Sequence, residues 1–211
     1  MRYIAVDVDG TLTHSNVSFS FGKYMYEQGL ISFFDASRST CSYFFHTLGL
    51  LSMESLHNSI FCSLFSGKRA DQIEKAADLF FEQKGNALFR LSVVEEILLL
   101  HKDGARVVLL SSSPDFLVEK VARYIGVEEW CATEYVVESG VFSKVGKIIT
   151  GSEKAKIAAE VRVKEGAPIT VFTDSALDLP LAFIADQVVA VSPDRALLRA
   201  SKEKGWRVIR G

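Results

Sequence analysis

The first stretch of the chain limits what it can fold into more than any other. The apolar and aromatic residues Tyr3 to Val6 run directly into Asp7 and Asp9, which are followed by a glycine. A short apolar run ended by a turn signal indicates a buried strand. Because strand side chains alternate, Asp7 and Asp9 point to the same side. Two carboxylates held this close stay ionised only with a cation or a proton between them, so the pair indicates a metal site or an acid–base pair.

Composition narrows the class of protein. The 211 residues are enough for one substantial domain, or for a core domain with a small insert. A net charge of -2 argues against nucleic acid as the main partner, because no basic surplus is present to neutralise phosphates. No apolar run approaches the roughly 18 residues of a membrane span, so stable membrane insertion is not expected. The early core strand leaves no room for a signal peptide, which predicts a cytoplasmic protein with reduced cysteines.

The rhythm of the chain changes twice. From Phe19 to Phe65 aromatic residues cluster without strand alternation, which predicts several short helices. An amphipathic helix is expected over Ala70 to Lys84, with Gly85 as its stop. From Ser92 onward, helical and strand patterns alternate, which predicts a mostly parallel sheet with right-handed crossovers.

The expected fold class is therefore α/β: a three-layer, Rossmann-like parallel sheet with an inserted all-helical cap. The core domain is expected over residues 1–13 and 88–211, and the cap over residues 14–87. Ser92 with Glu95, Ser113 with Pro114, and Ser152 are the expected helix starts in the core. Strands are expected at 106–110, 168–172, 187–191 and 206–209, with a hairpin at 135–142.

Polar residues stand where several expected strands end. Asp7, Ser111 and Asp174 each follow an apolar run directly. Parallel sheets bind ligands beyond the carboxyl ends of their strands. Three strands that deliver polar groups to one rim predict a functional site there.

Four motifs follow one another along the chain. The first runs from Asp7 to Thr11, and the second is Ser111 at the end of an apolar strand. The third is Lys154 at the start of a helix, and the fourth is Asp174 with Asp178 after another apolar strand. Together they resemble the haloacid dehalogenase superfamily of phosphotransferases, and in particular its phosphoserine-phosphatase-like subgroup, which carries a helical cap between the first two motifs.

The resemblance implies a division of labour between the first two aspartates. Asp7 is the expected nucleophile that attacks phosphorus and forms a covalent aspartyl phosphate. Asp9 is the expected acid that protonates the leaving alkoxide and then takes a proton from the hydrolytic water. Mg²⁺ is the expected cofactor, held by the Asp7 carboxylate, the Asp9 main-chain carbonyl and Asp174. Asp178 is expected to orient a metal-bound water or Lys154.

The resemblance also implies a phosphate site. Ser111 and Lys154 are expected to hold the phosphoryl oxygens, together with Gly10 and Ser112. A lysine in the first helical turn opposes the helix dipole, and such a broken local rule points to function. Lys156 breaks the same rule, and the choice of Lys154 rests on the family pattern. The alternative is that the aspartates of both motifs have a structural role only and cap a strand or a helix.

The predicted function is a magnesium-dependent phosphatase acting on a small phosphorylated metabolite. The alternatives are a phosphomutase or phosphotransferase of the same superfamily, or a non-catalytic binding protein on the same fold. Phosphoserine phosphatases carry a glutamate where this chain has Asn16, and they use a cap arginine. Between Arg38 and Lys68 the chain has neither Arg nor Lys. We therefore expect a leaving group less anionic or more apolar than serine, with Asn16 as a candidate specificity residue.

The aromatic cap allows two interpretations. The preferred one is that its aromatic residues form the core of the cap. In the other, the cap docks on a membrane or a partner protein. The oligomeric state is left open.

Overall fold

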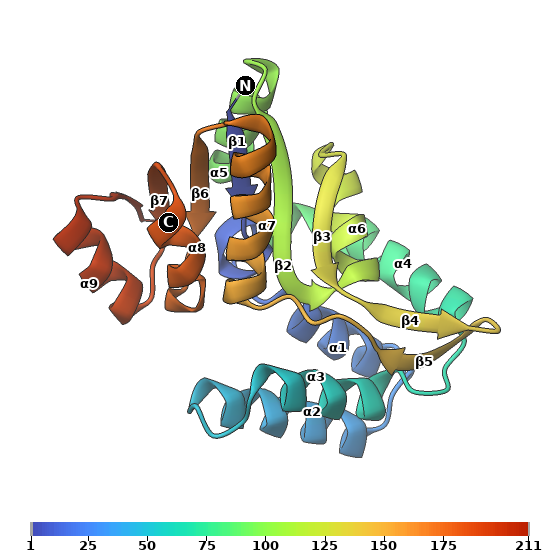
Figure 1. Ribbon diagram of the computed structural model, residues 1–211. Helices are drawn as coiled ribbons and strands as arrows, with labels where there is room; N and C mark the ends of the chain where they lie inside the picture. Colours follow the sequence, from blue (N-terminus) through green and yellow to red (C-terminus); the bar gives the residue numbers. More distant parts are fainter. Residues whose placement is uncertain (1, 211) are drawn as a thin grey trace.

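Strand β1, Tyr3–Val6, lies inside a six-stranded parallel sheet with the order β3-β2-β1-β6-β7-β8. Figure 1 shows this sheet in the computed structural model, which describes residues 2–210. The other strands are β2 Arg106–Pro114, β3 Glu129–Thr133, β6 Ile169–Thr173, β7 Gln187–Val191 and β8 Arg207–Ile209, with the hairpin β4 Tyr135–Glu138 and β5 Val141–Val145 outside the sheet. Parallel pairing throughout the sheet confirms the predicted fold class.

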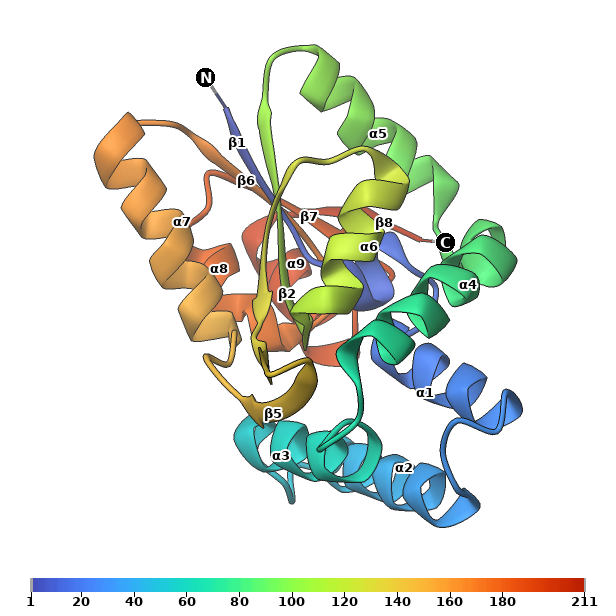
Figure 2. The same cartoon turned by 90° about the vertical axis from the view of Figure 1, so that its right-hand side faces the viewer.

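Side-chain alternation along β1 produces the three layers. Ile4 and Val6 pack into one apolar cluster with helices α5 Leu91–Lys102 and α6 Asp115–Ile125. Tyr3 and Ala5 pack into a second cluster with α7 Gly151–Glu165 and α8 Leu179–Ile184. Figure 2 shows the two helix pairs on opposite sides of the sheet. A strand buried on both faces reads as an unbroken apolar run, as it does here.

The segment between β1 and β2 is helical, as expected. It contains α1 Val17–Glu27, α2 Phe33–Thr47, α3 Met53–Leu64 and α4 Ala70–Leu88, after the irregular turn η1 Val8–Leu12. Phe21 of α1 and Phe80 of α4 belong to the same apolar cluster as β1, whereas α2 and α3 lie beyond the end of the sheet (Figure 1). The chain closes with the single turn η2 Ala176–Asp178 before α8, and with α9 Arg195–Lys204 before β8.

The prediction that the cap aromatics form a core is wrong for α2. That helix buries none of its residues, and Phe34 is 82% exposed. Phe33, Phe44 and Phe45 are also exposed. On α1 the aromatic residues divide, with Phe21 and Tyr24 buried and Phe19 and Tyr26 exposed, whereas those of α3 and α4 are buried. Similar composition therefore covers two different environments. In the described part of the chain, no helix is long and apolar enough to cross a membrane.

Two helix boundaries differ from the prediction in the middle of the chain. Helix α4 continues through Gly85 to Leu88. A Cβ at Gly85 would lie 2.6 Å from Tyr124 Cε2, so the glycine serves close packing and not a helix stop. Helix α5 begins at Leu91, without the predicted Ser92 capping box, because the Arg90 carbonyl already accepts the Val94 N–H at 3.1 Å.

Two further helix starts and one strand also differ. Ser113 lies in β2 and not at a helix start, because its hydroxyl bonds to Asp9 at 2.6 Å. Thr150 caps α7 in place of Ser152, and its hydroxyl accepts the Glu153 N–H at 3.3 Å. Strand β3, whose first residues are exposed, has no counterpart in the prediction because it lacks the alternating pattern of a strand.

Gly151 allows α7 to pack closely against the turn before α8. A Cβ at this position would lie 1.9 Å from the Leu177 carbonyl oxygen, a backbone atom that cannot swing aside. We expect Gly151→Ala to lower the free energy of unfolding by about 1–3 kcal/mol in denaturant melts. The control is Gly22→Ala inside α1, whose Cβ would meet Leu64 at an ordinary 3.6 Å. That change should raise stability by about 0.5–1 kcal/mol. Equal effects of the two variants would contradict the packing described here.

Candidate active site

The predicted site residues meet at the carboxyl edge of the sheet. Asp7 follows β1, Asp174 follows β6, and Lys154 reaches the same place from α7. Hydrogen bonds from the Asp7 N–H to the Phe172 carbonyl at 2.9 Å, and from Thr11 to both carboxylates, tie the strand ends together. Residues separated by more than 140 positions are thereby brought into one cluster by parallel strand pairing.

A buried lysine holds two aspartates at the centre of the cluster. Lys154 Nζ lies 2.6 Å from Asp7 Oδ1 and 2.9 Å from Asp178 Oδ2. Thr173 also donates to Asp178, at 2.9 Å. Burial alone lowers the pKa of Lys154, but Asp178 and Asp7 raise it above its ordinary value. The ammonium is therefore charged, and its position in the helix agrees with a role beyond helix formation.

Asp7 and Asp174 form a second pair, joined by one hydroxyl. Thr11 Oγ1 lies 3.1 Å from Asp7 Oδ2 and 3.2 Å from Asp174 Oδ1. Burial raises the pKa of Asp7 well above its ordinary value, against the opposing effect of Lys154. Burial likewise raises the pKa of Asp174 to about 6. A cation bound between two such carboxylates would favour the ionised form of both.

The donors around this pair fit a hard divalent cation. Among the described residues, no three His, Cys, Asp or Glu side chains gather as a metal cluster. Mg²⁺ needs fewer, because it binds through one or two carboxylates and keeps several waters. Gly10 leaves room beside the pair: its φ is +80°, and a Cβ there would lie 2.1 Å from Asp174 Oδ2. Asp7 and Asp174, with the Asp9 main-chain carbonyl, could therefore hold such an ion.

Asp9 is fixed by a separate hydrogen-bond network. Its Oδ1 accepts the N–H of Val17, at the start of α1, at 2.6 Å. Its Oδ2 accepts from Ser113 at 2.6 Å and from Ser111 at 3.4 Å. Burial raises the pKa of Asp9, and these hydrogen bonds oppose the rise. Ser18 of α1 continues the network, with its Oγ 2.7 Å from Ser113 Oγ.

The serine motif divides between the interior and the surface of the site. Ser111 is fully buried, and its hydroxyl also accepts the Ser113 N–H at 3.0 Å. Ser112 and Ser113 line the cavity in front of it. Asn16 lines the same cavity, but its side chain also caps α1 by accepting the Phe19 N–H at 2.8 Å.

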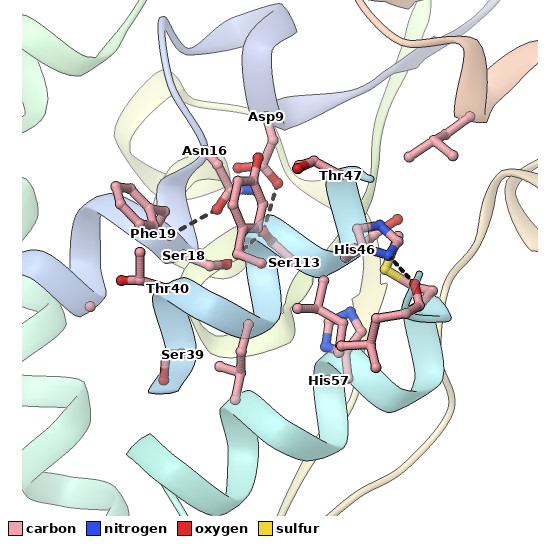
Figure 3. Close-up of a pocket in the computed structure, with 18 of the residues that line it drawn as sticks. Asp9, Asn16, Ser18, Phe19, Ser39, Thr40, His46, Thr47, His57 and Ser113 are labelled. Carbon is pink, nitrogen blue, oxygen red and sulfur yellow. Dashed lines mark hydrogen bonds between the residues drawn. The ribbon is translucent and has the colours of Figure 1, made fainter. Parts of the chain in front are cut away.

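A large cavity opens above these residues. Its volume is about 900 Å³, and it extends from Asp7 and Lys154 to the inner sides of α1, α2 and α3. Figure 3 shows Asp9, Asn16 and Ser113 gathered at one part of this cavity, with His46 and His57 on the cap helices farther from Asp9. The charged cluster thus forms one end of a pocket whose other walls come mainly from α1, α2 and α3.

Sequence reasoning missed three residues of the site. Thr11 was part of a motif but had no assigned role, although it bridges Asp7 and Asp174. Ser113 was read as a helix start, and Ser18 was not considered. The spacing of Ser111 and Ser113 contained a signal, because residues two apart on a strand share a side. No local pattern places Ser18, which reaches Asp9 only through the fold.

Comparison with known proteins places the chain among hydrolases. The family model of haloacid dehalogenase-like hydrolases matches residues 4–182. A probable phosphatase of Mycobacterium tuberculosis is 24% identical over 210 residues, covering 96% of this chain and 73% of that protein. A protein of unknown function from Bordetella pertussis has a similar structure, with a TM-score of 0.89, 18% identity and coverage of 99% and 97%. A substrate-bound phosphoserine phosphatase has a TM-score of 0.71, 19% identity and coverage of 99% and 93%.

The raised pKa of Asp174 predicts how pH and metal affect stability. A carboxyl whose pKa rises on folding, here from 3.8 to about 6, binds protons more tightly when folded. In a chelator, stability should therefore fall as the pH rises from about 4 to about 6, by up to about 3 kcal/mol from this group. Mg²⁺ should offset that loss, so its effect on the melting temperature should be larger at about pH 7.5 than at about pH 5.

The matched variants are Asp174→Asn and Asp103→Asn, the second at an exposed helix end. Thermal melts with chelator and with Mg²⁺ should show that Asp174→Asn loses the pH-dependent gain from Mg²⁺, while Asp103→Asn keeps it. An undiminished gain in Asp174→Asn would show that Asp174 does not hold the cation.

Proposed function

This chain belongs to the haloacid dehalogenase-like hydrolase family, and we propose that it is a magnesium-dependent phosphatase. Its substrate is a small phosphomonoester, and the reaction passes through an aspartyl phosphate on Asp7. The observation that carries the proposal is the position of Asp7 at the end of the cavity, beside a charged, buried lysine 2.6 Å away. The name of the mycobacterial relative, a probable phosphatase, supports the same reaction class.

In the first proposed step, an Asp7 carboxylate oxygen attacks phosphorus and the ester P–O bond breaks. Asp9 gives its proton to the departing alkoxide, and burial shifts the pKa of this carboxyl group in the direction that favours the protonated form. The Lys154 ammonium, together with Ser111 and Ser112, is assigned to the phosphoryl oxygens, where negative charge must be balanced. Gly10 is assigned to the same oxygens, because its backbone lies beside Asp174 where a Cβ would not fit.

In the second step, water attacks phosphorus, the bond to Asp7 breaks, and inorganic phosphate leaves. Asp9 takes the proton of this water and so returns to its starting state. Magnesium, when bound by Asp7, Asp174 and the Asp9 carbonyl, supplies positive charge for the phosphoryl group. Asp178 is assigned the positioning of Lys154, from which it lies 2.9 Å away.

Replacement of the nucleophile tests the proposal. Asp7→Asn removes a negative oxygen but keeps the shape of the side chain. We expect turnover of p-nitrophenyl phosphate with Mg²⁺ to fall at least about 10³-fold, while the circular dichroism spectrum stays native. Asp103→Asn, an exposed control, should turn over like the unchanged protein. Unchanged turnover in Asp7→Asn would overturn the mechanism.

Ser113 offers a second test, because its hydroxyl donates to Asp9 at 2.6 Å. A typical hydrogen bond contributes about 0.5–1.5 kcal/mol, and this one fixes the Asp9 carboxyl group, so Ser113→Ala should lower kcat by about two- to tenfold. KM should change little, since the lost contact is to Asp9 and not to substrate. Ser66→Ala, at an exposed serine in the loop after α3, is the matched control. Equal kcat in both variants would remove Ser113 from the mechanism.

A further inference from the structure

The cap side of the cavity is mostly apolar. The cavity, at about 900 Å³, is near the upper end of the roughly 300–1,000 Å³ that pockets for drug-sized ligands occupy. A phosphate group fills only the end formed by the aspartates and Lys154. The remaining walls come from α1, α2 and α3 and the loops beside them; their apolar and aromatic members are Phe19, Tyr26, Ile31, Ala36, Tyr43, Leu51, Met53, Leu56, Ile60, Leu64 and Phe65.

Positive charge is scarce around that apolar space. Among the described lining residues, only Lys23 and Lys154 carry a permanent cation. Lys154 is already held by Asp7 and Asp178. The Lys23 side chain is 70% exposed and lies 3.8 Å from Glu27, so it sits at the rim in solvent. Among the described lining residues, a substrate carboxylate at the cap helices would therefore have only this exposed lysine as a charged partner.

The two histidines on the cap add polarity without a fixed charge. His57 of α3 is buried, with Nδ1 3.2 Å from the Tyr135 hydroxyl. Burial lowers its pKa to about 4, so it is neutral at physiological pH. His46 of α2 uses its Nδ1 on the Leu51 carbonyl, at 2.8 Å. Each ring lines the cavity with its Nδ1 already in a hydrogen bond.

The acids of the cavity do not select a cationic leaving group either. Asp7, Asp9 and Asp174 belong to the phosphate end. Asp194 caps α9, and its two oxygens accept the Leu197 N–H at 2.7 Å and the Ala176 N–H at 2.8 Å. On α1, α2 and α3, the exposed Lys23 is the one Lys, Arg, Asp or Glu among the described lining residues.

We infer that the substrate is the phosphomonoester of a bulky, uncharged and largely apolar alcohol, bound with that alcohol against α1, α2 and α3. This inference rests on the proposed phosphatase function and names its substrate class. The energetic reason is burial: each methylene group removed from water into the apolar walls strengthens transition-state binding by about fourfold.

A series of straight-chain alkyl phosphates tests the inference directly. Ethyl, butyl, hexyl and octyl phosphate share nearly the same leaving-group chemistry. Differences in kcat/KM therefore report the contacts that the alkyl chain of the substrate makes with the protein. We expect kcat/KM to rise by about two- to fourfold per added methylene, and so by at least about 60-fold from ethyl to octyl phosphate. Phosphoserine and phosphocholine, which carry charged alcohols, should be poorer than butyl phosphate.

Two variants locate the effect. Ile60→Ser changes a partly buried residue that lines the cavity, and it should reduce the octyl-to-ethyl ratio of kcat/KM by about tenfold. Phe44→Ser removes an exposed aromatic residue of α2 that is not among the lining residues, so it should leave the ratio unchanged. An equal loss in both variants would contradict the assigned binding surface.

The outcomes separate this inference from the proposed function. Asp7-dependent hydrolysis that is flat or falling along the alkyl series, or best with phosphoserine or phosphocholine, overturns the substrate class and leaves the phosphatase intact. If none of these phosphomonoesters and no p-nitrophenyl phosphate is hydrolysed, the proposed function fails and this inference fails with it.

Discussion

The buried ion pair of Lys154 with Asp7 and Asp178 is the interaction on which the site depends. Buried carboxylates at strand ends are costly to ionise, and one charged partner within 2.9 Å compensates two of them. Lys154 reaches both carboxylates because the start of α7 packs closely against the turn before α8. Gly151 allows this contact, since there is no space for a side chain at its position. The packing of the α7 N-terminus therefore determines where the charged lysine lies.

The order of strands turns distant residues into neighbours. β1 lies between β2 and β6, so the ends of all three open onto the same rim. Asp7 and Asp174 then share Thr11, while Asp9 turns away towards Ser113 and α1. This separation fits unequal roles for the two aspartates of the first motif: one faces the lysine and the proposed metal position, and the other is held by neutral donors.

Much of this arrangement was predictable from the sequence, because burial at strand ends leaves a clear pattern. Asp7, Lys154 and Asp174 were placed by apolar runs and motif order, and the structure brings them together. The helix starts at Ser92, Ser113 and Ser152 were wrong, because a serine near a helix start competes with neighbours one or two residues away. Ser18 and the exposure of α2 depend on how distant segments pack, which composition does not encode.

The central claim is that Asp7 becomes covalently phosphorylated. Asp9→Asn should slow mainly the second step when the substrate is p-nitrophenyl phosphate with Mg²⁺, because p-nitrophenolate leaves without being protonated, so the intermediate should accumulate. Acid quenching within the turnover time, followed by proteolysis and tandem mass spectrometry, locates the phosphoryl group. The account predicts one phosphoryl group on Asp7 and none in Asp7→Asn. Phosphorylation of another residue, or continued turnover with Asp7 never modified, would contradict it.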